Sequence, residues 1–219
     1  MSDLKRYMHA VKRPVAMVLL GSAMVFSLQG CFGVIAGGVV AGTLAATDRR
    51  TLGAQTEDKS IAVKGEIAIP KVVGDAGHVN VTSFNRKVLL TGEVPSEAAK
   101  EAAAREASRI EGVQSVVNEL AVSGASGFGS RSNDTLITGK VKASIVDNRT
   151  LYANSIKVVT ERGIVYLMGR VTEREGDLAA NIARGVSGVQ KVVKVFEYIS
   201  DEEYRMLSTT PESQPAQKQ

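Results

Sequence analysis

The stretch VLLTGEV at residues 88–94 recurs as VYLMGRV at residues 165–171, and it decides the fold. About twenty residues further on, GVQSVV at 112–117 recurs as GVQKVV at 188–193. The repeat period of about 76 residues is too long for a solenoid unit. The chain therefore contains two homologous small domains in tandem.

The second copy predicts a helix, two strands, a helix and a closing strand. Asn133-Asp134-Thr135 offers N-cap side chains for the first helix, and apolar residues then recur at every fourth position. Glu161-Arg162-Gly163 joins two β-branched runs and indicates a hairpin. The expected elements are a helix from 133, strands over 155–160 and 164–171, a helix over 173–186 and a strand over 189–199.

The first copy predicts the same order of elements. Its expected elements are a helix over 57–69 ended or kinked by Pro70, strands over 79–84 and 87–94, a helix over 96–110 and a strand over 113–122. The fold class is thus α+β, with two α-β-β-α-β domains. In each, two helices pack on a small three-stranded mixed sheet.

The remaining segments are expected to be non-globular. Residues 123–132 (SGASGFGSRS) have the Gly/Ser composition of a flexible linker, and residues 201–219 have that of a disordered tail. The first domain accordingly spans residues 57–122 and the second 133–200.

The N-terminus has the layout of a cleaved export signal. Residues 1–13 are polar and basic, residues 14–30 carry no charge, and Leu28-Gln29-Gly30 precedes the chain's single cysteine, Cys31. This end resembles a bacterial lipobox, which implies cleavage after Gly30 and lipid on Cys31. Residues 31–56 would then form a Gly/Ala-rich lipidated leader.

Two other interpretations of Cys31 remain open. The charge-free run from Pro14 to Thr47 is long enough for an uncleaved transmembrane anchor, although its second half is only weakly hydrophobic. Cys31 could also be a buried thiol. A single cysteine excludes an internal disulfide.

Charge argues against nucleic acid as a partner. Residues 31–219 carry 23 basic and 22 acidic side chains, a net charge of +1, whereas nucleic-acid binding depends on neutralising phosphates. The two domains differ, however. Residues 57–122 have 8 basic and 10 acidic side chains, or −2, and residues 132–200 have 10 and 7, or +3. The second domain is therefore the better candidate for an anionic surface.

The repeated motifs resemble the BON domain, over residues 57–200 in two copies. Together with the lipobox, the chain resembles dual-BON lipoproteins of the outer membrane. Phe32 follows the cysteine, where an aspartate would resemble an inner-membrane retention signal. The resemblance implies a lipid-anchored protein on the periplasmic face. It would bind an anionic, phosphatidylglycerol-like membrane mainly through its second domain and support outer-membrane integrity.

The start of the helix at 133 is the predicted lipid-binding site. Leu136 lies one step round the helix from the core face and above Lys140, so it forms an apolar tip beside a cation. The alternative is that Leu136 packs at the edge of the core. By the resemblance, an aromatic residue is expected at this place. The predicted site comprises Asn133, Asp134, Thr135, Leu136, Lys140 and Lys142.

Catalysis is not expected. The mature chain keeps one histidine, His78, and no His/Cys/Asp cluster indicates a metal site or a cofactor. The glycines are interpreted as structural. Gly92 and Gly169 interrupt strands where a helix packs closely, and Gly112 and Gly188 are predicted C′ caps. A scaffold that contacts the outer-membrane assembly machinery, without recognising lipid, is the alternative function.

Overall fold

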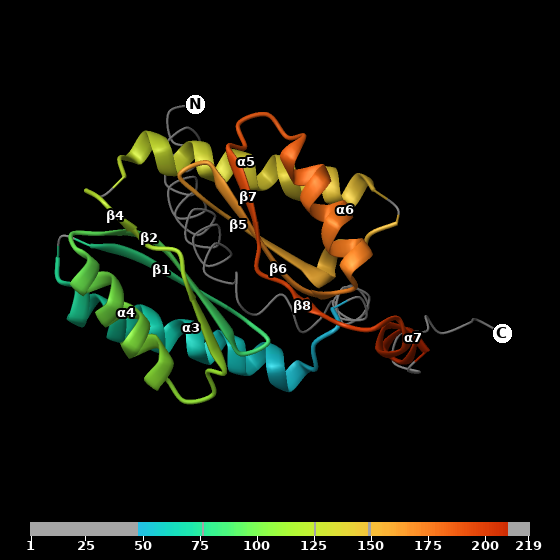
Figure 1. Cartoon of the computed structure of the whole chain (residues 1–219), viewed down its shortest axis with the longest axis horizontal. Coiled ribbons are helices and arrows are strands. Elements are labelled where there is room, and N and C mark those ends of the chain that lie inside the picture. The colour runs from blue at the N-terminus through green and yellow to red at the C-terminus, as the bar shows by residue number, and fades with distance from the viewer. Residues whose placement is uncertain (1–47, 76, 125, 149, 210–219) are drawn as a thin grey trace, which may run out of the picture. The chain divides into compact units, whose positions relative to one another are not determined.

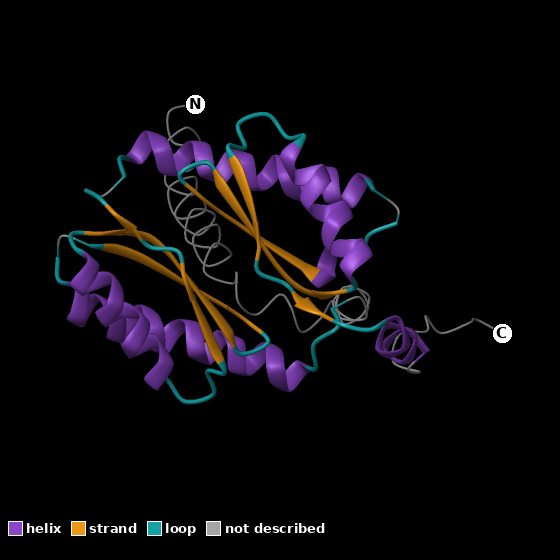
Figure 2. Cartoon of the chain, viewed as in Figure 1, coloured by secondary structure: helices purple, strands orange, loops and turns teal. Residues whose placement is uncertain are grey.

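The computed structural model describes residues 48–209 except residues 76, 125 and 149. The described residues belong to one compact unit, within which the same arrangement of a small sheet and two covering helices occurs twice (Figures 1 and 2). The predicted signal, Cys31 and most of the predicted leader lie outside the described residues.

The first domain has the predicted element order, with its closing strand broken in two. Its elements are α3 (Leu52–Val73), β1 (His78–Phe84), β2 (Lys87–Val94), α4 (Glu97–Arg109), β3 (Ser115–Asn118) and β4 (Ala121–Val122). Strand β2 is central: β1 pairs with it antiparallel, while β3 and β4 both pair with it parallel.

The second domain repeats this topology around β6. Its elements are α5 (Phe128–Asp147), a short 3₁₀ turn (Ala153–Ser155), β5 (Ile156–Glu161), β6 (Ile164–Val171), α6 (Glu173–Arg184), β7 (Lys191–Lys194) and β8 (Glu197–Tyr198). Strand β5 is antiparallel to β6, and β7 and β8 are parallel to it. The predicted mixed sheet with two helices is confirmed in both copies, except that each sheet has four strands instead of three because the closing strand is broken in two.

Side-chain oxygens accept backbone hydrogen bonds at the starts of α3, α4 and α6. Thr51 and Ser96 accept hydrogen bonds from Ala54 N and Ala99 N, at 3.1 and 3.2 Å, at the starts of α3 and α4. Thr172 and Glu175 form a capping box at the start of α6. Helix α5 begins instead after Gly127, whose cap has no side-chain hydrogen bond.

The predicted N-cap at Asn133-Asp134-Thr135 is wrong, because α5 begins five residues earlier, within the predicted linker. Asp134 turns inward and its carboxylate accepts hydrogen bonds from Arg162 N and Gly163 N, both at 2.8 Å. Asp58 does the same for the other hairpin, accepting from Asn85 N at 2.7 Å and from Arg86 N at 2.8 Å. One repeat period separates these two aspartates, so each domain closes its β-hairpin with its first helix.

The tail differs from its prediction over residues 201–209, which form a helix, α7 (Asp201–Thr209). Its Glu203 pairs with Arg170 on β6, and this tertiary contact outweighs a composition typical of disorder. The rest of the predicted tail, residues 210–219, lies outside the described residues.

Each sheet separates two apolar layers. On one face, the helices and the sheet enclose the core of that domain, around Leu90 and Val94 in the first domain and around Leu167 and Val171 in the second. The opposite faces of the two sheets share a third cluster. Its buried members are Phe84, Leu89, Tyr166, Met168 and Val195. The two domains therefore pack sheet against sheet, with their helices on the outer faces.

The strand glycines are structural, but their close neighbours are backbone atoms of β1 and of the 3₁₀ turn rather than the predicted helix. Gly92 adopts φ +115°, and a β-carbon there would collide with the carbonyl oxygen of His78 on β1. A β-carbon at Gly169 would likewise collide with the carbonyl oxygen of Ser155. The predicted C′ caps are displaced: α4 and α6 are capped by Ile110 and Gly185. Gly112 and Gly188 follow later, as positive-φ turn residues.

Candidate functional site

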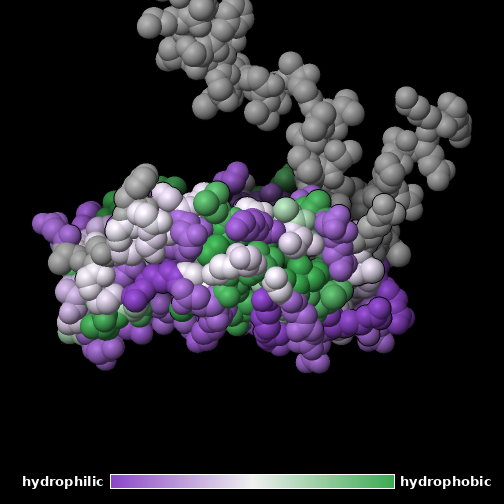
Figure 3. Space-filling view, turned by 90° about the horizontal axis from the view of Figure 1, so that it is seen from above, coloured by the Kyte–Doolittle hydropathy of each residue, from purple (hydrophilic) through white to green (hydrophobic). Residues whose placement is uncertain are grey.

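A row of exposed apolar residues runs along the outer face of α5. Leu136, Gly139, Ala143 and Val146 follow one another at intervals of three, four and three residues, which places them on one side of a helix. Leu136 is 63% exposed and Val146 is 67% exposed. We call these four residues the outer stripe of α5. Figure 3, viewed from the α5 side of Figure 1, shows hydrophobic surface bordered by hydrophilic residues.

Two lysines flank the outer stripe of α5. Lys140 follows Leu136 by one helical turn and Lys142 precedes Val146 by one turn, so they lie on opposite sides of the stripe. Both are exposed, and neither makes an ion pair with any described residue. An apolar ridge between free cations suits a surface whose headgroups are anionic and whose interior is apolar.

The structure divides the other predicted site residues. Asn133 and Thr135 are exposed, although the Thr135 hydroxyl donates to Arg131 O at 3.0 Å within the helix. Asp134 is 5% exposed, and the hairpin occupies both of its carboxylate oxygens. Asp134 therefore stabilises the β5–β6 hairpin and is not part of the proposed binding face. Cys31 lies outside the described residues.

Helix α3 carries a comparable apolar row on the first domain. Val63 is 54% exposed and Ile67, one turn later, is 58% exposed. Its electrostatic setting differs, because Lys64 pairs with Glu111 at 3.2 Å and the first domain is net acidic. Each helical layer covers the sheet face turned away from the other domain, so α3 and α5 lie on opposite sides (Figure 1). One flat membrane cannot meet both rows together.

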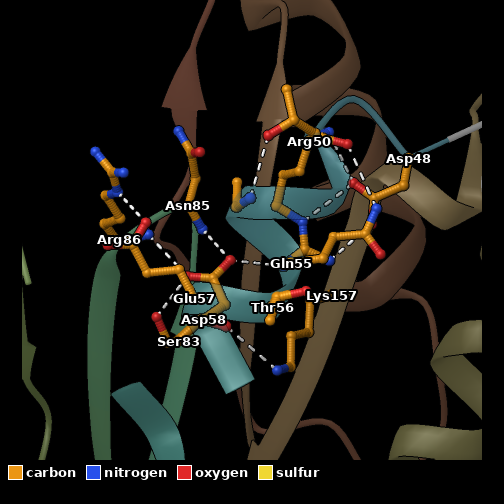
Figure 4. Close-up of polar contacts among 12 residues, drawn as sticks. Asp48, Arg50, Gln55, Thr56, Glu57, Asp58, Ser83, Asn85, Arg86 and Lys157 are labelled. Carbon is orange, nitrogen blue, oxygen red and sulfur yellow. Dashed lines mark hydrogen bonds and ion pairs between the residues drawn. The ribbon is translucent and has the colours of Figure 1, made fainter. Parts of the chain in front are cut away.

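Consecutive arginines tie the segment before α3 to both domains. Both terminal nitrogens of Arg49 bind the Glu175 carboxylate, at 2.6 and 2.8 Å, and its guanidinium lies over the Tyr204 ring, 4.8 Å from the centroid. Arg50 binds Asp58 at 2.8 Å in the first domain (Figure 4). Its guanidinium also stacks on Phe84, 3.9 Å from the ring centroid. We call Arg49 and Arg50 the arginine clamp.

The clamp changes the ionisation of Glu175. Burial acts to raise the pKa of Glu175, but hydrogen bonds from Arg49 and Thr172 outweigh it, so the net pKa is lowered. A carboxyl with a lowered folded-state pKa stabilises the fold above its ordinary pKa. That contribution is lost as the pH falls through the lowered value. The Arg49–Glu175 pair therefore holds throughout the neutral range.

Polar contacts also cross between the two sheets. Asn80 donates to Glu161 at 2.8 Å, and Asn85 donates to Glu197 at 2.6 Å. Glu93 on β2 is fully buried, and neither of its carboxylate oxygens has a hydrogen-bond partner among the described residues. Burial raises the pKa of Glu161, the Asn80 hydrogen bond opposes this, and Glu93 raises it further.

Nothing in residues 48–209, where described, indicates a resident metal or a membrane span. These residues contain no group of three His, Cys, Asp or Glu side chains placed to hold a metal ion. None of their helices is long and apolar enough to cross a bilayer.

Two segments of the chain match a known domain. Residues 61–124 and 133–200, more than half of the chain, each match the BON domain. The chain belongs to the BON-domain family. We refer to its two copies as BON1 and BON2.

Curated relatives place the chain within this family. It is 41% identical to "Outer membrane lipoprotein DolP" of Haemophilus influenzae over 83% of this chain and 94% of that protein. It is 35% identical to "21 kDa hemolysin" of Actinobacillus pleuropneumoniae, over 69% and 79%. The chain is thus a DolP-like dual-BON lipoprotein. Among solved structures, the C-terminal domain of CdsD from the Chlamydia trachomatis type III secretion system matches at 10% identity. The TM-score is 0.27, over 61% of this chain and 96% of that domain.

Sequence reasoning missed several residues that shape BON1 and BON2. The paired roles of Asp58 and Asp134 could have been found, because aspartate recurs at the repeat period. Val146 could also have been added, since it continues the three-and-four spacing from Leu136. Arg49 carries no such signal, because its partner Glu175 lies 126 residues away in the sequence.

Proposed function

We propose that this BON lipoprotein is anchored through lipid on Cys31 at the periplasmic face of the outer membrane, where BON2 binds anionic phospholipid without catalysing a reaction. The outer stripe of α5 is the binding face. The observation that carries the proposal is the exposure of Leu136 and Val146 between two lysines that form no ion pair with a described residue. Supporting outer-membrane integrity is the proposed role of this contact.

Simple energetics favours this arrangement. Burying an exposed leucine in the acyl boundary contributes roughly 2 kcal/mol, and each lysine near an anionic surface adds about 1 kcal/mol. Such a contact is weak by itself. A lipid anchor on the same chain would keep BON2 at high local concentration beside the bilayer, so weak intrinsic affinity suffices.

Replacing Leu136 with glutamate is expected to weaken binding to phosphatidylglycerol vesicles by about tenfold or more. The change removes an apolar contact worth roughly 2 kcal/mol, and each 1.4 kcal/mol corresponds to tenfold in affinity. Vesicle sedimentation with residues 46–219, which contain both cores, measures this. Val63→Glu on α3 is the matched control and should change affinity less than about twofold. Equal losses in the two variants would contradict the assignment to α5.

A scaffold function is the second candidate, and the Val63–Ile67 row of α3 favours it. This row lies on the acidic BON1 domain, where it suits a protein partner with a basic, apolar surface, such as a component of the envelope assembly machinery. The two functions are separable. If wild-type protein ignores phosphatidylglycerol vesicles, and Val63→Glu but not Leu136→Glu increases outer-membrane permeability in cells, the scaffold function is favoured.

A further inference from the structure

A pocket of about 370 Å³ opens at the C-terminal half of α5. BON2 supplies most of its wall from α5 and β5. Phe84 of BON1 and Arg50, in the segment before α3, complete the wall. The apolar side chains at its base are almost fully buried. They are Phe84, Ile145, Ile156 and Val158. A volume of this size lies at the lower end of the range for small-molecule sites.

The charged groups around this pocket are all cations. Lys142, Lys157 and Arg50 line it, and no carboxylate does. Arg50 is already paired with Asp48 and Asp58, so the two lysines supply the uncompensated charge. Lys157 makes one long hydrogen bond, to Ser83 O at 3.4 Å (Figure 4).

The two lysines and Arg50 repel one another in the absence of an anion. Burial lowers the pKa of Lys157, and the nearby charges of Arg50 and Lys142 lower it further, with only partial opposition from Asp58. A bound anion would relieve this repulsion and form charge-assisted hydrogen bonds with the lysines.

The pocket and the outer stripe of α5 are continuous. Val146 is the last residue of the stripe and also lines the pocket, and Lys142 flanks the stripe while lining the pocket. A membrane that meets the stripe therefore brings its headgroups to the mouth of the pocket. This continuity selects a lipid over a soluble metabolite as the occupant.

We infer that this pocket binds the phosphodiester of a single anionic phospholipid, with the phosphate held by Lys142 and Lys157 and the glycerol and first acyl carbons lying on the apolar base. The inference deepens the proposed function and rests on it: the stripe gives attachment to a surface, whereas the pocket recognises one molecule.

The test separates the pocket from the stripe by using lipid monomers. Residues 46–219 are titrated with dihexanoyl-phosphatidylglycerol below its critical micelle concentration and followed by amide chemical shifts. Dihexanoyl-phosphatidylcholine and inorganic phosphate are the comparison ligands. Lys157→Met keeps most of the length and the apolar character of the side chain and removes its charge. Lys71→Met, at an exposed lysine on α3, is the matched control.

We expect phosphatidylglycerol monomers to shift residues 142–146 and 153–158 most. Lys157→Met should weaken this binding by about tenfold or more, and Lys71→Met by less than about twofold. Leu136→Glu should leave monomer binding within about twofold of wild type while weakening vesicle binding by about tenfold or more. Absence of monomer binding, or unchanged binding in Lys157→Met, would overturn the pocket. Equal affinity for inorganic phosphate or for phosphatidylcholine would overturn its assignment to an anionic lipid.

The two proposals fail in different ways. Suppose that the protein binds vesicles, that Leu136→Glu abolishes this binding, and that lipid monomers leave the chemical shifts of the pocket residues unchanged. The proposed membrane face is then supported and the proposed pocket is wrong. If monomers bind the pocket but wild-type protein ignores vesicles, the proposed membrane attachment falls.

Discussion

Gly92→Val is expected to lower the free energy of unfolding by about 3 kcal/mol or more. Gly92 adopts φ +115°, which strains any residue with a β-carbon, and the added carbon would collide with the carbonyl oxygen of His78. Strain of this kind costs roughly 1–3 kcal/mol, and forcing extra atoms into a packed site costs a similar amount. Relief would require breaking the β1–β2 pairing, on which the BON1 core depends.

Urea unfolding of residues 46–219, followed by circular dichroism, measures this effect. Gly139→Ala is the matched control of opposite sign, because Gly139 lies within α5 and a β-carbon there meets nothing within 4 Å. Alanine at this position should stabilise the protein by about 0.5–1 kcal/mol. A loss below about 1 kcal/mol for Gly92→Val would show that the strand accommodates a side chain.

The second large effect concerns the aspartates that close the hairpins. Asp134→Ala should cost about 2–3 kcal/mol, because it leaves two backbone N–H groups at the hairpin without their acceptor. Asp58→Ala should cost more, about 3–5 kcal/mol, because Asp58 also accepts from Ser83 and pairs with the partly buried Arg50. The same unfolding measurement applies.

Asp75→Ala, at an exposed aspartate, provides the reference for removing a surface carboxylate and should change stability by less than about 0.5 kcal/mol. The ranking is the informative outcome. If Asp134→Ala were as mild as Asp75→Ala, its carboxylate would not be holding the hairpin. Asp134 would then return to the candidate binding residues.

The repeat made most of the fold predictable. Copies of one motif had to share one topology, and the β-branched runs beside Gly92 and Gly169 fixed the order of the strands. The start of α5 was mispredicted because the side chains that favour an N-cap can accept a hydrogen bond from any nearby backbone N–H. Asp134 accepts instead from the β5–β6 hairpin, where Arg162 lies 28 residues away in the sequence. Local composition also mispredicted residues 201–209 as disordered, because it cannot indicate the ion pair between Glu203 of α7 and Arg170 of β6.

The candidate site was predictable only on its helical side. Leu136 and Lys140 could be placed by helical periodicity, because residues one turn apart share a face. The pocket could not, since Phe84 and Lys157 meet only after two domains pack sheet against sheet, and nothing in either repeat specifies that contact. The arginine clamp is likewise a long-range arrangement. The outward-facing row on α3 shows that periodicity alone does not select which helix faces the membrane.

Tryptophan fluorescence tests most directly whether α5 is the face that meets the membrane. The chain contains no tryptophan, so Leu136→Trp and Ile67→Trp each place a single reporter, on α5 and on α3, and tryptophan itself favours the membrane interface. With phosphatidylglycerol vesicles, we predict a blue shift and rise in emission for Leu136→Trp, no change for Ile67→Trp, and neither effect with phosphatidylcholine. A blue shift at position 67 with an unchanged spectrum at position 136 would contradict the account.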